Sequence, residues 1–228
     1  MASRLRAFFR RSAPSAERPA DWHRRAVGGM WDEIGQHQYD YLVAQGLQPQ
    51  HQMLDVGCGS LRGGLRFIRY LDAGNYVGFD INQELLDHGK MELAQAGLTD
   101  KAPVLVQTDA FDVTSLGRRF DFALAQSVFT HLPLNPIIRC LVMVDKVLAP
   151  TGRFYATFFE NPDGKRNLGE ITHPATVGRQ IESHFDRDPF HYDVATMEWA
   201  CDGLNLTCEY IGEWGHPRGQ RMLLFRRP

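Results

Sequence analysis

The chain has 228 residues, of which 43% are hydrophobic, and this composition predicts one sizeable core with little material for a second domain. Its 25 basic residues nearly balance its 27 acidic residues, so no overall charge favours binding to nucleic acid or to an anionic membrane. No segment reaches the roughly 20 consecutive apolar residues that a membrane-spanning helix needs.

The four cysteines are scattered and form no Cys-x-x-Cys pair, so the sequence predicts neither a disulfide framework nor a zinc site. A reducing cytoplasm is the compartment that this usage favours. A metal site could be drawn from His184, Asp186, His191 and Asp193, but their spacing matches no known metal motif, and no metal is expected.

Residues 1–20 hold five arginines and one glutamate and have no continuous apolar segment, which distinguishes them from a secretory signal. We interpret them as a flexible basic arm that precedes one domain over residues 21–228. A short amphipathic helix that rests weakly on a membrane surface through Leu5, Phe8 and Phe9 is an alternative, and so is a transit peptide.

From residue 31 onward, the pattern alternates between helices and strands. Apolar positions predict helices over residues 31–47 and 83–96. Asn135-Pro136 combines a capping side chain with proline at the first helical position, and so predicts a helix that ends at Leu148. Strands are predicted over residues 52–56, 75–79, 103–107, 120–125 and 153–159. This alternation predicts a parallel sheet with helices on both faces.

The C-terminal part departs from this alternation. Residues 161–192 are rich in Pro, Gly, His and Asp, and we expect an insert there with a helix over residues 175–185. A helix over residues 193–202 follows, and the strands at 206–214 and 221–226 are joined by so short a turn that they must be antiparallel. The predicted fold class is therefore α/β, a doubly wound, mostly parallel seven-stranded sheet with an antiparallel C-terminal strand pair.

The strongest functional signal is the segment LDVGCGSLRGG at residues 54–64, which follows a strand and opens a helix. Gly57 and Gly59 permit a tight turn and let a ligand lie against the backbone. Asp55 would repel the pyrophosphate of a dinucleotide but favours a ligand with a cationic sulfonium and an ammonium group. Arg62 stands where a dinucleotide-binding loop has its third glycine, so both residues argue against the alternative of a nicotinamide-dependent oxidoreductase.

Two more acids follow the next strands. Asp80 lies 21 residues after Gly59, the spacing at which a carboxylate accepts hydrogen bonds from ribose hydroxyls. Asp109 ends the following strand, where a carboxylate can receive an adenine amino group. Because the carboxyl ends of parallel strands share one edge of a sheet, Asp55, Asp80 and Asp109 are expected to lie along a single ligand-binding edge.

The chain resembles the class I S-adenosylmethionine-dependent methyltransferases in five segments within residues 53–159, namely LDVGCGSLRGG, YVGFDIN, QTDAFD, FDFALAQSVFTHL and LAPTGRFYATFF. The resemblance implies S-adenosylmethionine as the cofactor and a Rossmann-like methyltransferase fold. It further implies cofactor-binding roles for Asp55, Gly57, Gly59, Asp80, Ile81, Asp109, Ala110 and Gln126. Leu61 departs from the family pattern, in which many members carry another glycine. This departure implies that the methionine end of the cofactor binds in a slightly different position.

A narrower resemblance involves WDEIGQHQYDYL before the first motif and GHPRGQRMLLF near the end. Both segments are similar to bacterial methyltransferases found beside surface-polysaccharide and natural-product genes. The resemblance implies a small-molecule or glycan acceptor. The segment after the fourth strand also lacks the Asn/Asp-Pro-Pro-Tyr pattern by which methylators of planar amide or base nitrogens resemble one another.

Methyl transfer from a sulfonium is an in-line displacement, so orientation supplies most of the catalysis, and a general base helps when the acceptor is a hydroxyl. His131 follows the fourth strand and is the first candidate for this base, because imidazole titrates near neutrality. Packing or capping near the next helix is its alternative role. His216 is the second candidate, with solvation in a turn as its alternative. The predicted reaction is O-methylation of a hydroxyl.

Substrate contacts are predicted for Glu160, at the end of the fifth strand, and for Trp214 and Arg218 near the terminal strand pair. Trp214 offers an aromatic face and Arg218 a fixed positive charge. The insert at residues 161–192 is expected to cover the acceptor pocket. A cofactor-binding module that lacks its own activity and partners a catalytic subunit would carry the same motifs and stays open as an alternative.

Overall fold

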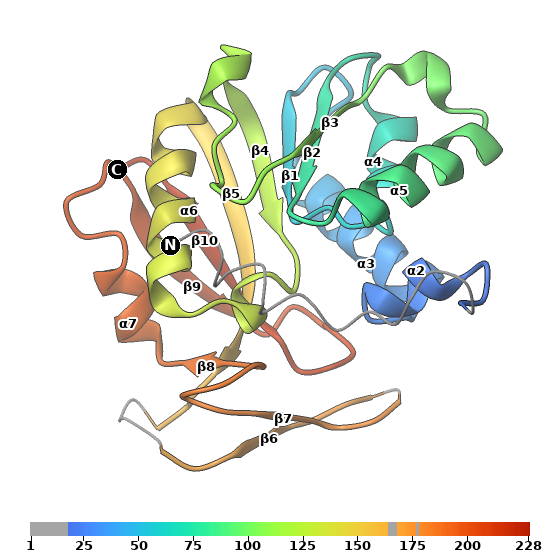
Figure 1. Ribbon diagram of the computed structural model, residues 1–228. Helices are drawn as coiled ribbons and strands as arrows, with labels where there is room; N and C mark the ends of the chain where they lie inside the picture. The colour runs from blue at the N-terminus through green and yellow to red at the C-terminus, as the bar shows by residue number, and fades with distance from the viewer. Residues whose placement is uncertain (1–17, 164–167, 177) are drawn as a thin grey trace.

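The computed structural model describes residues 18–228 except 164–167 and 177, and it shows three layers, with helices on either side of a central sheet (Figure 1). The strands are β1 (Met53–Val56), β2 (Tyr76–Asp80), β3 (Val104–Gln107), β4 (Phe120–Ala125), β5 (Leu148–Glu160), β6 (Ile171–His173), β7 (Ile181–Ser183), β8 (His191–Tyr192), β9 (Thr207–Gly212) and β10 (Arg221–Arg226). The helices are α2 (Trp22–Ala26), α3 (Trp31–Ala44), α4 (Gly64–Tyr70), α5 (Gln83–Gln95), α6 (Leu134–Val147), α7 (Val194–Trp199) and the short 3-10 helices η2 (Thr99–Lys101), η3 (Thr114–Leu116) and η4 (Phe129–His131).

The central sheet runs in the order β3-β2-β1-β4-β5-β10-β9. Strands β1 to β5 are parallel, whereas β10 lies antiparallel between β5 and β9. The short strand β8 adds to the end of β5. All residues of β1 are buried, as expected of a parallel strand that helices cover on both faces. The predicted fold class, including the antiparallel C-terminal pair, is confirmed.

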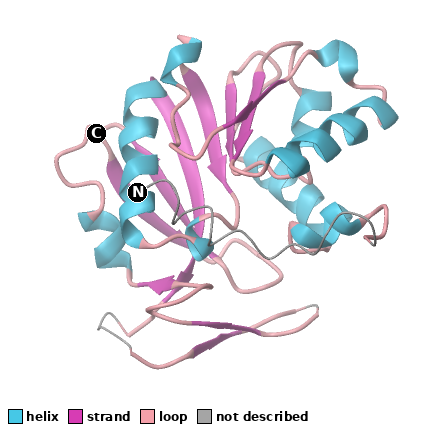
Figure 2. Ribbon diagram, in the orientation of Figure 1, coloured by secondary structure: helices cyan, strands magenta, loops and turns pink. Residues whose placement is uncertain are grey.

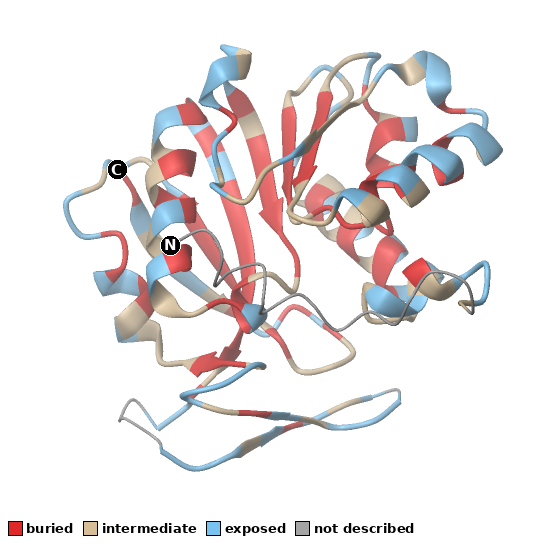
Figure 3. Ribbon diagram, in the orientation of Figure 1, coloured by how far each residue is buried: buried red, intermediate tan, exposed pale blue. Residues whose placement is uncertain are grey.

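Helices pack on both faces of the sheet (Figure 2). On one face, α6 contributes four buried residues at the i, i+3, i+4 and i+7 positions, namely Ile137, Cys140, Leu141 and Val144. On the other face, α3, α4 and α5 contribute to a second apolar cluster that includes Leu42, Phe67 and Leu86. The strands of the sheet form the buried centre between these layers (Figure 3).

The insert at residues 161–192 differs from the prediction. The helix expected over residues 175–185 is wrong, because β6 and β7 form an antiparallel hairpin in which Ile171 pairs with Ser183. Gly178, with a φ of +83°, lies in the connection, and its left-handed backbone is incompatible with a continuous helix. The hairpin projects from the domain beyond the end of β5 (Figure 1).

Two helix starts differ in how they are capped. α6 begins at Leu134 with Pro133 as its N-cap residue, so the cap predicted for Asn135 is wrong. The extended backbone of Pro133, with a ψ of 160°, already leads the chain into the helix and places Asn135 inside the first turn. α7 instead follows Asp193, whose carboxylate accepts a hydrogen bond of 2.7 Å from the Thr196 amide.

The described chain begins near the end of the predicted arm. Arg18 forms an ion pair of 3.1 Å with Glu84 and lies over the ring of Trp22, so contacts with the domain begin within the stretch predicted as an arm. Residues 1–17, which include the apolar side chains considered for membrane contact, lie outside the described residues. In the described part of the chain, no helix has the length and apolar character to cross a membrane.

Candidate functional site

Strand order places the predicted site residues along one edge of the sheet. Because β1 lies between β2 and β4, the carboxyl ends of these strands bring the glycine loop, Asp80 and Gln126 next to one another. Asp109 follows β3 on one flank, and Glu160 ends β5 on the other. We call this edge, at which β4 ends in Figure 1, the ligand edge.

The loop after β1 depends on two glycines. Gly57 and Gly59 have φ angles of +69° and +54°, which residues with a side chain rarely adopt. A Cβ atom on Gly57 would lie 2.6 Å from Cγ2 of Val128. A Cβ atom on Gly59 would lie 2.6 Å from Cγ1 of Val27. The glycines therefore permit both the tight turn and the close approach of the segments that cover it.

Leu61 shows how the chain accommodates its departure from the family pattern. Its φ of +72° lies in the left-handed region that favours glycine, at a backbone cost of about 1–2 kcal/mol. The side chain is fully buried beside Gly64 and Gly89, where an added Cβ would come within 2.8 and 3.0 Å of Leu61 atoms. Burial of the leucine side chain thus offsets the strain, and the loop keeps the left-handed backbone that a glycine would adopt here.

Asp80 joins the glycine loop to helix α5. Its Oδ2 accepts a hydrogen bond of 2.9 Å from the Gly59 amide, and its Oδ1 accepts one of 2.8 Å from the Asn82 amide. The Asn82 side chain in turn caps α5. Burial raises the pKa of the Asp80 carboxyl against the opposing effect of these amides. Together with the Ile81 amide, these donors leave at least one of the four lone-pair sites of the carboxylate open, so a ribose hydroxyl can still donate to it.

Asp55 is buried at the end region of β1, with 5% of its surface exposed. It accepts a hydrogen bond of 2.6 Å from the Tyr76 hydroxyl. Burial raises the pKa of Asp55 to about 7, although the Tyr76 hydrogen bond and the charge of Arg62 lower it. Near neutral pH this carboxyl is therefore poised between its two protonation states, and a nearby cation would favour the ionised form.

Arg62, which the sequence analysis treated only as a missing glycine, is a buried cation at 7% exposure. Its Nη1 donates to the carbonyl oxygens of Val27 and Gly29 at 2.7 and 3.1 Å. Its Nε is buried and has no hydrogen-bond partner among the residues that the structure describes. Burial, followed by the charge of Arg218, lowers the pKa of Arg62 to about 10. A ligand carboxylate would supply a hydrogen bond and a countercharge.

Residues 22–30 form what we call the N-terminal cover of the ligand edge. The Ser60 hydroxyl and the Arg218 guanidinium donate hydrogen bonds to its carbonyl oxygens. Arg24 fastens the cover to α5 through two hydrogen bonds to Glu92, of 2.7 and 2.9 Å. Charged side chains therefore hold this cover in place.

Gln126 lies just after β4 and is 8% exposed. Its Nε2 lies 3.0 Å from Ser127 Oγ, 3.2 Å from Gln220 Oε1 and 3.1 Å from His216 Nε2. Its Oε1 is buried without a hydrogen-bond partner in the described part of the chain. A ligand ammonium group would satisfy this acceptor.

The predicted adenine side is more open. Asp109 is half-buried and Ala110 is exposed. The Ala110 amide donates to Thr108 Oγ1 at 3.2 Å, and the Gln107 side chain donates to the Ile81 carbonyl at 3.1 Å. Short local hydrogen bonds therefore shape this flank without covering it.

Comparison with known proteins identifies methyltransferases as relatives of this chain. Residues 54–154 match the family described as "Methyltransferase domain". The chain is 28% identical over 127 residues to cycloartenol-C-24-methyltransferase of Arabidopsis thaliana, a match that covers 56% of this chain and 36% of the plant protein. It is 25% identical over 167 residues to 2-phytyl-1,4-naphtoquinone methyltransferase of a Nostoc species, covering 73% of this chain and 69% of that protein.

Solved structures share the fold over nearly the whole chain. Magnesium protoporphyrin IX methyltransferase from Synechocystis, solved with bound SAM, has a TM-score of 0.61 and 13% identity, and the match covers 97% of this chain and 90% of that one. The glycopeptide N-methyltransferase MtfA with S-adenosyl-L-homocysteine has a TM-score of 0.61 and 15% identity, covering 95% and 100%. Residues 54–154 therefore carry a methyltransferase domain, and the fold of the chain is that of solved S-adenosylmethionine-dependent methyltransferases.

S-adenosylmethionine is accordingly the cofactor of this methyltransferase, and the residues present fit it. The methionine end of the cofactor carries a carboxylate and an ammonium group. The buried, unpartnered atoms at the ligand edge are a donor, Arg62 Nε, and an acceptor, Gln126 Oε1, within the described residues. The two kinds of group are complementary, so the fold leaves polar atoms of the right character for this ligand.

His216 was predicted as a second candidate base, and the methyltransferase uses both of its ring nitrogens internally. Its Nδ1 accepts a hydrogen bond of 3.2 Å from the Arg218 amide, and its Nε2 lies 3.1 Å from Gln126 Nε2. Burial, then the charges of Arg62 and its neighbours, lowers the pKa of His216 to about 3. This environment suits a buried, neutral imidazole rather than one that accepts a proton from an acceptor.

Trp214 was predicted to offer an aromatic face to the acceptor. Its ring is only 8% exposed, and its Nε1 donates to the Gln220 carbonyl at 3.0 Å. The ring centroids of His37 and His216 lie 4.4 and 5.4 Å away. The protein itself therefore covers the aromatic face, and Trp214 belongs to the core.

The other two predicted substrate contacts are also engaged within the fold. Glu160 accepts a hydrogen bond of 2.6 Å from the Tyr210 hydroxyl and lies 3.5 Å from the Arg221 guanidinium. Arg218 donates to the carbonyl of Gly28 in the N-terminal cover. Both side chains thus hold elements of the domain together at the ligand edge.

His131, the first candidate base, occupies a different environment. It lies in η4, just beyond β4, and its side chain is 46% exposed. Its Nδ1 lies 2.5 Å from Oδ1 of Asp188, which comes from the connection between β7 and β8. Sequence reasoning missed Asp188, because 57 residues separate the pair and no local pattern links them.

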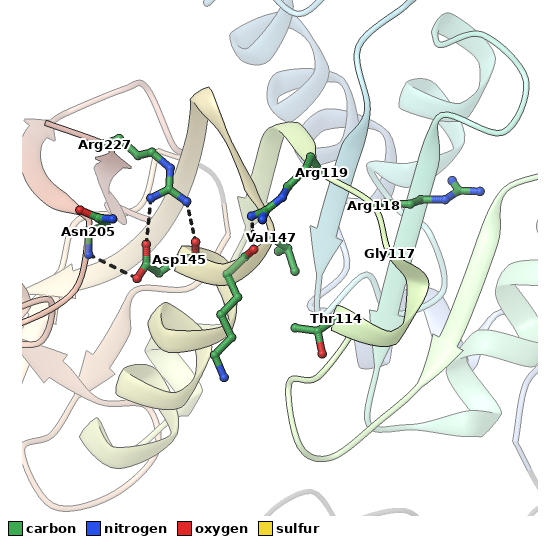
Figure 4. Close-up of a pocket in the computed structure, with 9 residues that line it drawn as sticks. Thr114, Gly117, Arg118, Arg119, Asp145, Val147, Asn205 and Arg227 are labelled. Carbon is green, nitrogen blue, oxygen red and sulfur yellow. Dashed lines mark hydrogen bonds and ion pairs between the residues drawn. The ribbon is translucent and has the colours of Figure 1, made fainter.

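A cavity of about 580 Å³ lies at the opposite edge of the sheet, where β4 begins (Figure 4). Arg227 donates to the carbonyl oxygens of Asp145 and Leu148 and pairs with the Asp145 carboxylate, while Arg119 donates to the Lys146 carbonyl. These arginines satisfy carbonyl groups at the C-terminal end of α6, where the helix dipole favours cations. The cavity is separate from the ligand edge.

Proposed function

We propose that this methyltransferase transfers the methyl group of S-adenosylmethionine to a hydroxyl group of a small molecule or glycan, with His131 as the general base. The position of His131 carries the proposal. Its imidazole is 46% exposed beside the ligand edge, and within the described chain only its Nδ1 is engaged. Its Nε2 is therefore available to an acceptor, in contrast to the nitrogens of His216.

Bound S-adenosylmethionine supplies an electrophilic methyl group on a sulfonium. Arg62 and Gln126 are proposed to hold its carboxylate and its ammonium group. Asp80 would accept hydrogen bonds from the ribose hydroxyls, and Asp109 with Ala110 would contact adenine beside Ile81. Asp55 would face the positive charge of the methionine end. The buried cation and the buried amide oxygen without partners support this assignment, within the described residues.

The acceptor side requires proton removal when the nucleophile is a hydroxyl. His131 Nε2 would accept the proton that the acceptor hydroxyl loses as the bound cofactor supplies its methyl group to the oxygen. A base of this kind contributes about 10²- to 10⁴-fold to the rate. Orientation of the acceptor under the insert supplies most of the remainder.

The relatives support a small organic acceptor without specifying the methylated atom. Their names indicate a sterol-type carbon, a naphthoquinone, a magnesium protoporphyrin and a glycopeptide nitrogen. The exposed imidazole is what favours oxygen, because methylation of a neutral amine needs no base before bond formation.

The test has two parts. Calorimetric titration with S-adenosylmethionine measures cofactor binding, and incubation with bacterial metabolite and glycan extracts plus methyl-deuterated S-adenosylmethionine detects labelled products by mass spectrometry. We expect a labelled methyl ether with the wild-type protein and a loss of about 10²-fold or more with His131→Gln. His51→Gln, two residues before β1, serves as the matched control.

Each result separates the candidate functions. Cofactor binding without product in any extract would favour a binding module that lacks its own activity. A labelled N-methyl or C-methyl product, or full activity in His131→Gln, would contradict O-methylation with His131 as the base. Product formation that survives in His51→Gln but not in His131→Gln supports it.

A further inference from the structure

We propose that Asp188 is a positioning residue that fixes the tautomer of His131 and leaves its Nε2 free to accept a proton. The inference rests on the proposed function, because it assigns Asp188 a role through His131. An ionised carboxylate can only accept hydrogen bonds, and Asp188 Oδ1 lies 2.5 Å from His131 Nδ1. The ring proton of a neutral His131 therefore resides on Nδ1, and the lone pair resides on Nε2.

The backbone around the pair is fixed on both sides of His131. The Phe190 amide donates to the carbonyl of Thr130 at 2.7 Å, and the Tyr192 hydroxyl donates to the carbonyl of Leu132 at 2.7 Å. Phe190 is 4% exposed. The segment that carries Asp188 is thus attached to the residues immediately before and after the histidine.

The same segment is continuous with the main sheet. Strand β8 pairs in parallel with the end of β5, where His191 lies opposite Phe159. A backbone hydrogen bond also closes the turn that carries Asp188, because the His184 amide donates to the carbonyl of Pro189 at 2.7 Å. Asp188 therefore reaches His131 from a braced turn of the insert, and the cover of the acceptor side supplies the group that orients the base.

This arrangement links the insert to the chemistry. After the acceptor hydroxyl gives its proton to Nε2, the resulting imidazolium still faces the Asp188 carboxylate, which stabilises the positive charge. The proton then leaves from Nε2 to water. An acceptor that must lose a proton benefits from this pair, so the inferred substrate class is a molecule that presents a hydroxyl to His131.

The competing explanation is a surface ion pair with no functional role. Side chains of His131 and Asp188 are 46% and 39% exposed, and ion pairs at that exposure contribute about 0–1 kcal/mol to stability. If the pair has only such a structural role, removal of Asp188 leaves the tautomer of His131 and the turnover unchanged. The tautomer is therefore the measurement that distinguishes the two.

The experiment uses the full chain labelled with ¹⁵N-histidine, at about pH 8, where an ordinary imidazole is neutral. The His131 signals are assigned by their loss in His131→Gln. In the wild type, we expect a protonated Nδ1 and an unprotonated Nε2. In Asp188→Ala, the proton should move to Nε2 in most molecules, and Asp188→Asn, which preserves size, provides a second variant should the alanine variant fold poorly.

Asp186→Asn is the matched control, because Asp186 is an exposed acid in the same segment. We expect it to keep the wild-type tautomer and full activity in the extract assay, whereas Asp188→Ala and Asp188→Asn lose about 10- to 100-fold in turnover. Affinity for S-adenosylmethionine should be equal in all four proteins, since the pair lies on the acceptor side.

The outcomes for the inference and for the proposed function are distinguishable. A wild-type tautomer that persists in both Asp188 variants overturns the inference, whatever the activity. A changed tautomer with undiminished activity also overturns it. If His131→Gln keeps full activity, the proposed base is wrong even where the tautomer responds to Asp188.

Discussion

The ligand edge has two covers that are held by different chemistry. The N-terminal cover, residues 22–30, is fastened by the charged side chains of Arg62, Arg218 and Arg24. The insert, residues 161–192, is fastened by backbone hydrogen bonds and by a buried group of neutral polar side chains. The N-terminal cover is therefore held mainly by charged side chains, and we call it the charged side. The insert is held mainly by backbone and buried polar hydrogen bonds, and we call it the neutral side, although the Asp188–His131 pair is one charged contact there.

The neutral group of the insert consists of three buried side chains. Ser183 Oγ lies 2.6 Å from His173 Nε2 and 3.0 Å from His191 Nδ1. The His173 ring also stacks on Phe159 at the end of β5, with 4.3 Å between the ring centroids. These contacts dock the β6–β7 hairpin on the end of β5.

The largest expected effect is on the charged side. Arg62→Met keeps the length of the side chain but removes the buried cation, so S-adenosylmethionine loses the charge-assisted partner proposed for its carboxylate. We expect its affinity to fall about 100-fold, corresponding to roughly 3 kcal/mol, in calorimetric titration. Arg69→Met, at an exposed position of the following helix α4, is the control and should bind normally.

A second ligand sharpens this test. 5′-Methylthioadenosine has the adenosine and the sulfur but neither the carboxylate nor the ammonium group. Its affinity should be the same for the wild type and Arg62→Met. An equal loss for both ligands would show that the substitution damages the glycine loop and that Arg62 does not bind the carboxylate.

The next effect concerns Asp80, which is proposed to bind the ribose of the cofactor. Asp80→Ala should weaken S-adenosylmethionine and methylthioadenosine alike, by about 1.5–3 kcal/mol or roughly 10- to 150-fold, because hydrogen bonds from ribose hydroxyls to a charged group are lost. The loop contribution is measured separately by melting temperature, since Asp80 also accepts the Gly59 amide. Unchanged dissociation constants in Asp80→Ala would contradict the assignment.

The sequence predicts the positions of the glycine loop and its acids better than it predicts the structure of the insert. Glycines at a strand end and acids after successive strands are local patterns, because the fold itself brings those strand ends to one edge. Gly57, Gly59 and Asp80 therefore lie where the sequence predicts. Arg62 was noticed as an exception to a glycine pattern, but its burial against carbonyl groups could be seen only in three dimensions.

The insert could not be predicted in the same way. A helix is predicted over residues 175–185, whereas the chain forms a hairpin whose connection contains Gly178 in a left-handed conformation. Its functional contact, Asp188 with His131, joins residues from distant parts of the chain. Trp214 likewise suggested an open aromatic surface, whereas packing against His37 places it in the core.

A third prediction concerns two buried histidines, His173 and His216, and the dependence of stability on pH. Burial lowers the pKa of His173 to about 4 and that of His216 to about 3, both below the ordinary value of 6.5. Folding thus favours the neutral imidazoles, and this contribution to stability is fully present above pH 6.5 and is lost as the pH falls from 6.5 toward 4. Asp55, whose pKa is raised to about 7, contributes in the opposite direction over this window, so the histidine contribution is measured as the difference in pH slope between the wild type and a histidine variant.

The slope can be assigned to the insert by substitution. His173→Gln keeps a polar partner for Ser183 but cannot be protonated, so its melting temperature should fall less steeply with pH than that of the wild type. His51→Gln, far from the insert, should keep the wild-type slope. Identical slopes in all three proteins would show that docking of the hairpin does not depend on a neutral His173.

The smallest expected effect is a release of protons from Asp55 when the cofactor binds. Burial raises the pKa of Asp55 to about 7, so part of the Asp55 carboxyls carry a proton near neutral pH in the free protein. The positive charges of bound S-adenosylmethionine favour the ionised form, and binding should therefore release protons near pH 7. Calorimetry in phosphate and in Tris, whose ionisation enthalpies differ, measures this release. The release should vanish at about pH 9, where Asp55 is already ionised, and in Asp55→Asn at every pH. A release that persists in Asp55→Asn would come from another group, and the absence of release in the wild type would mean that the cofactor's charge does not reach Asp55.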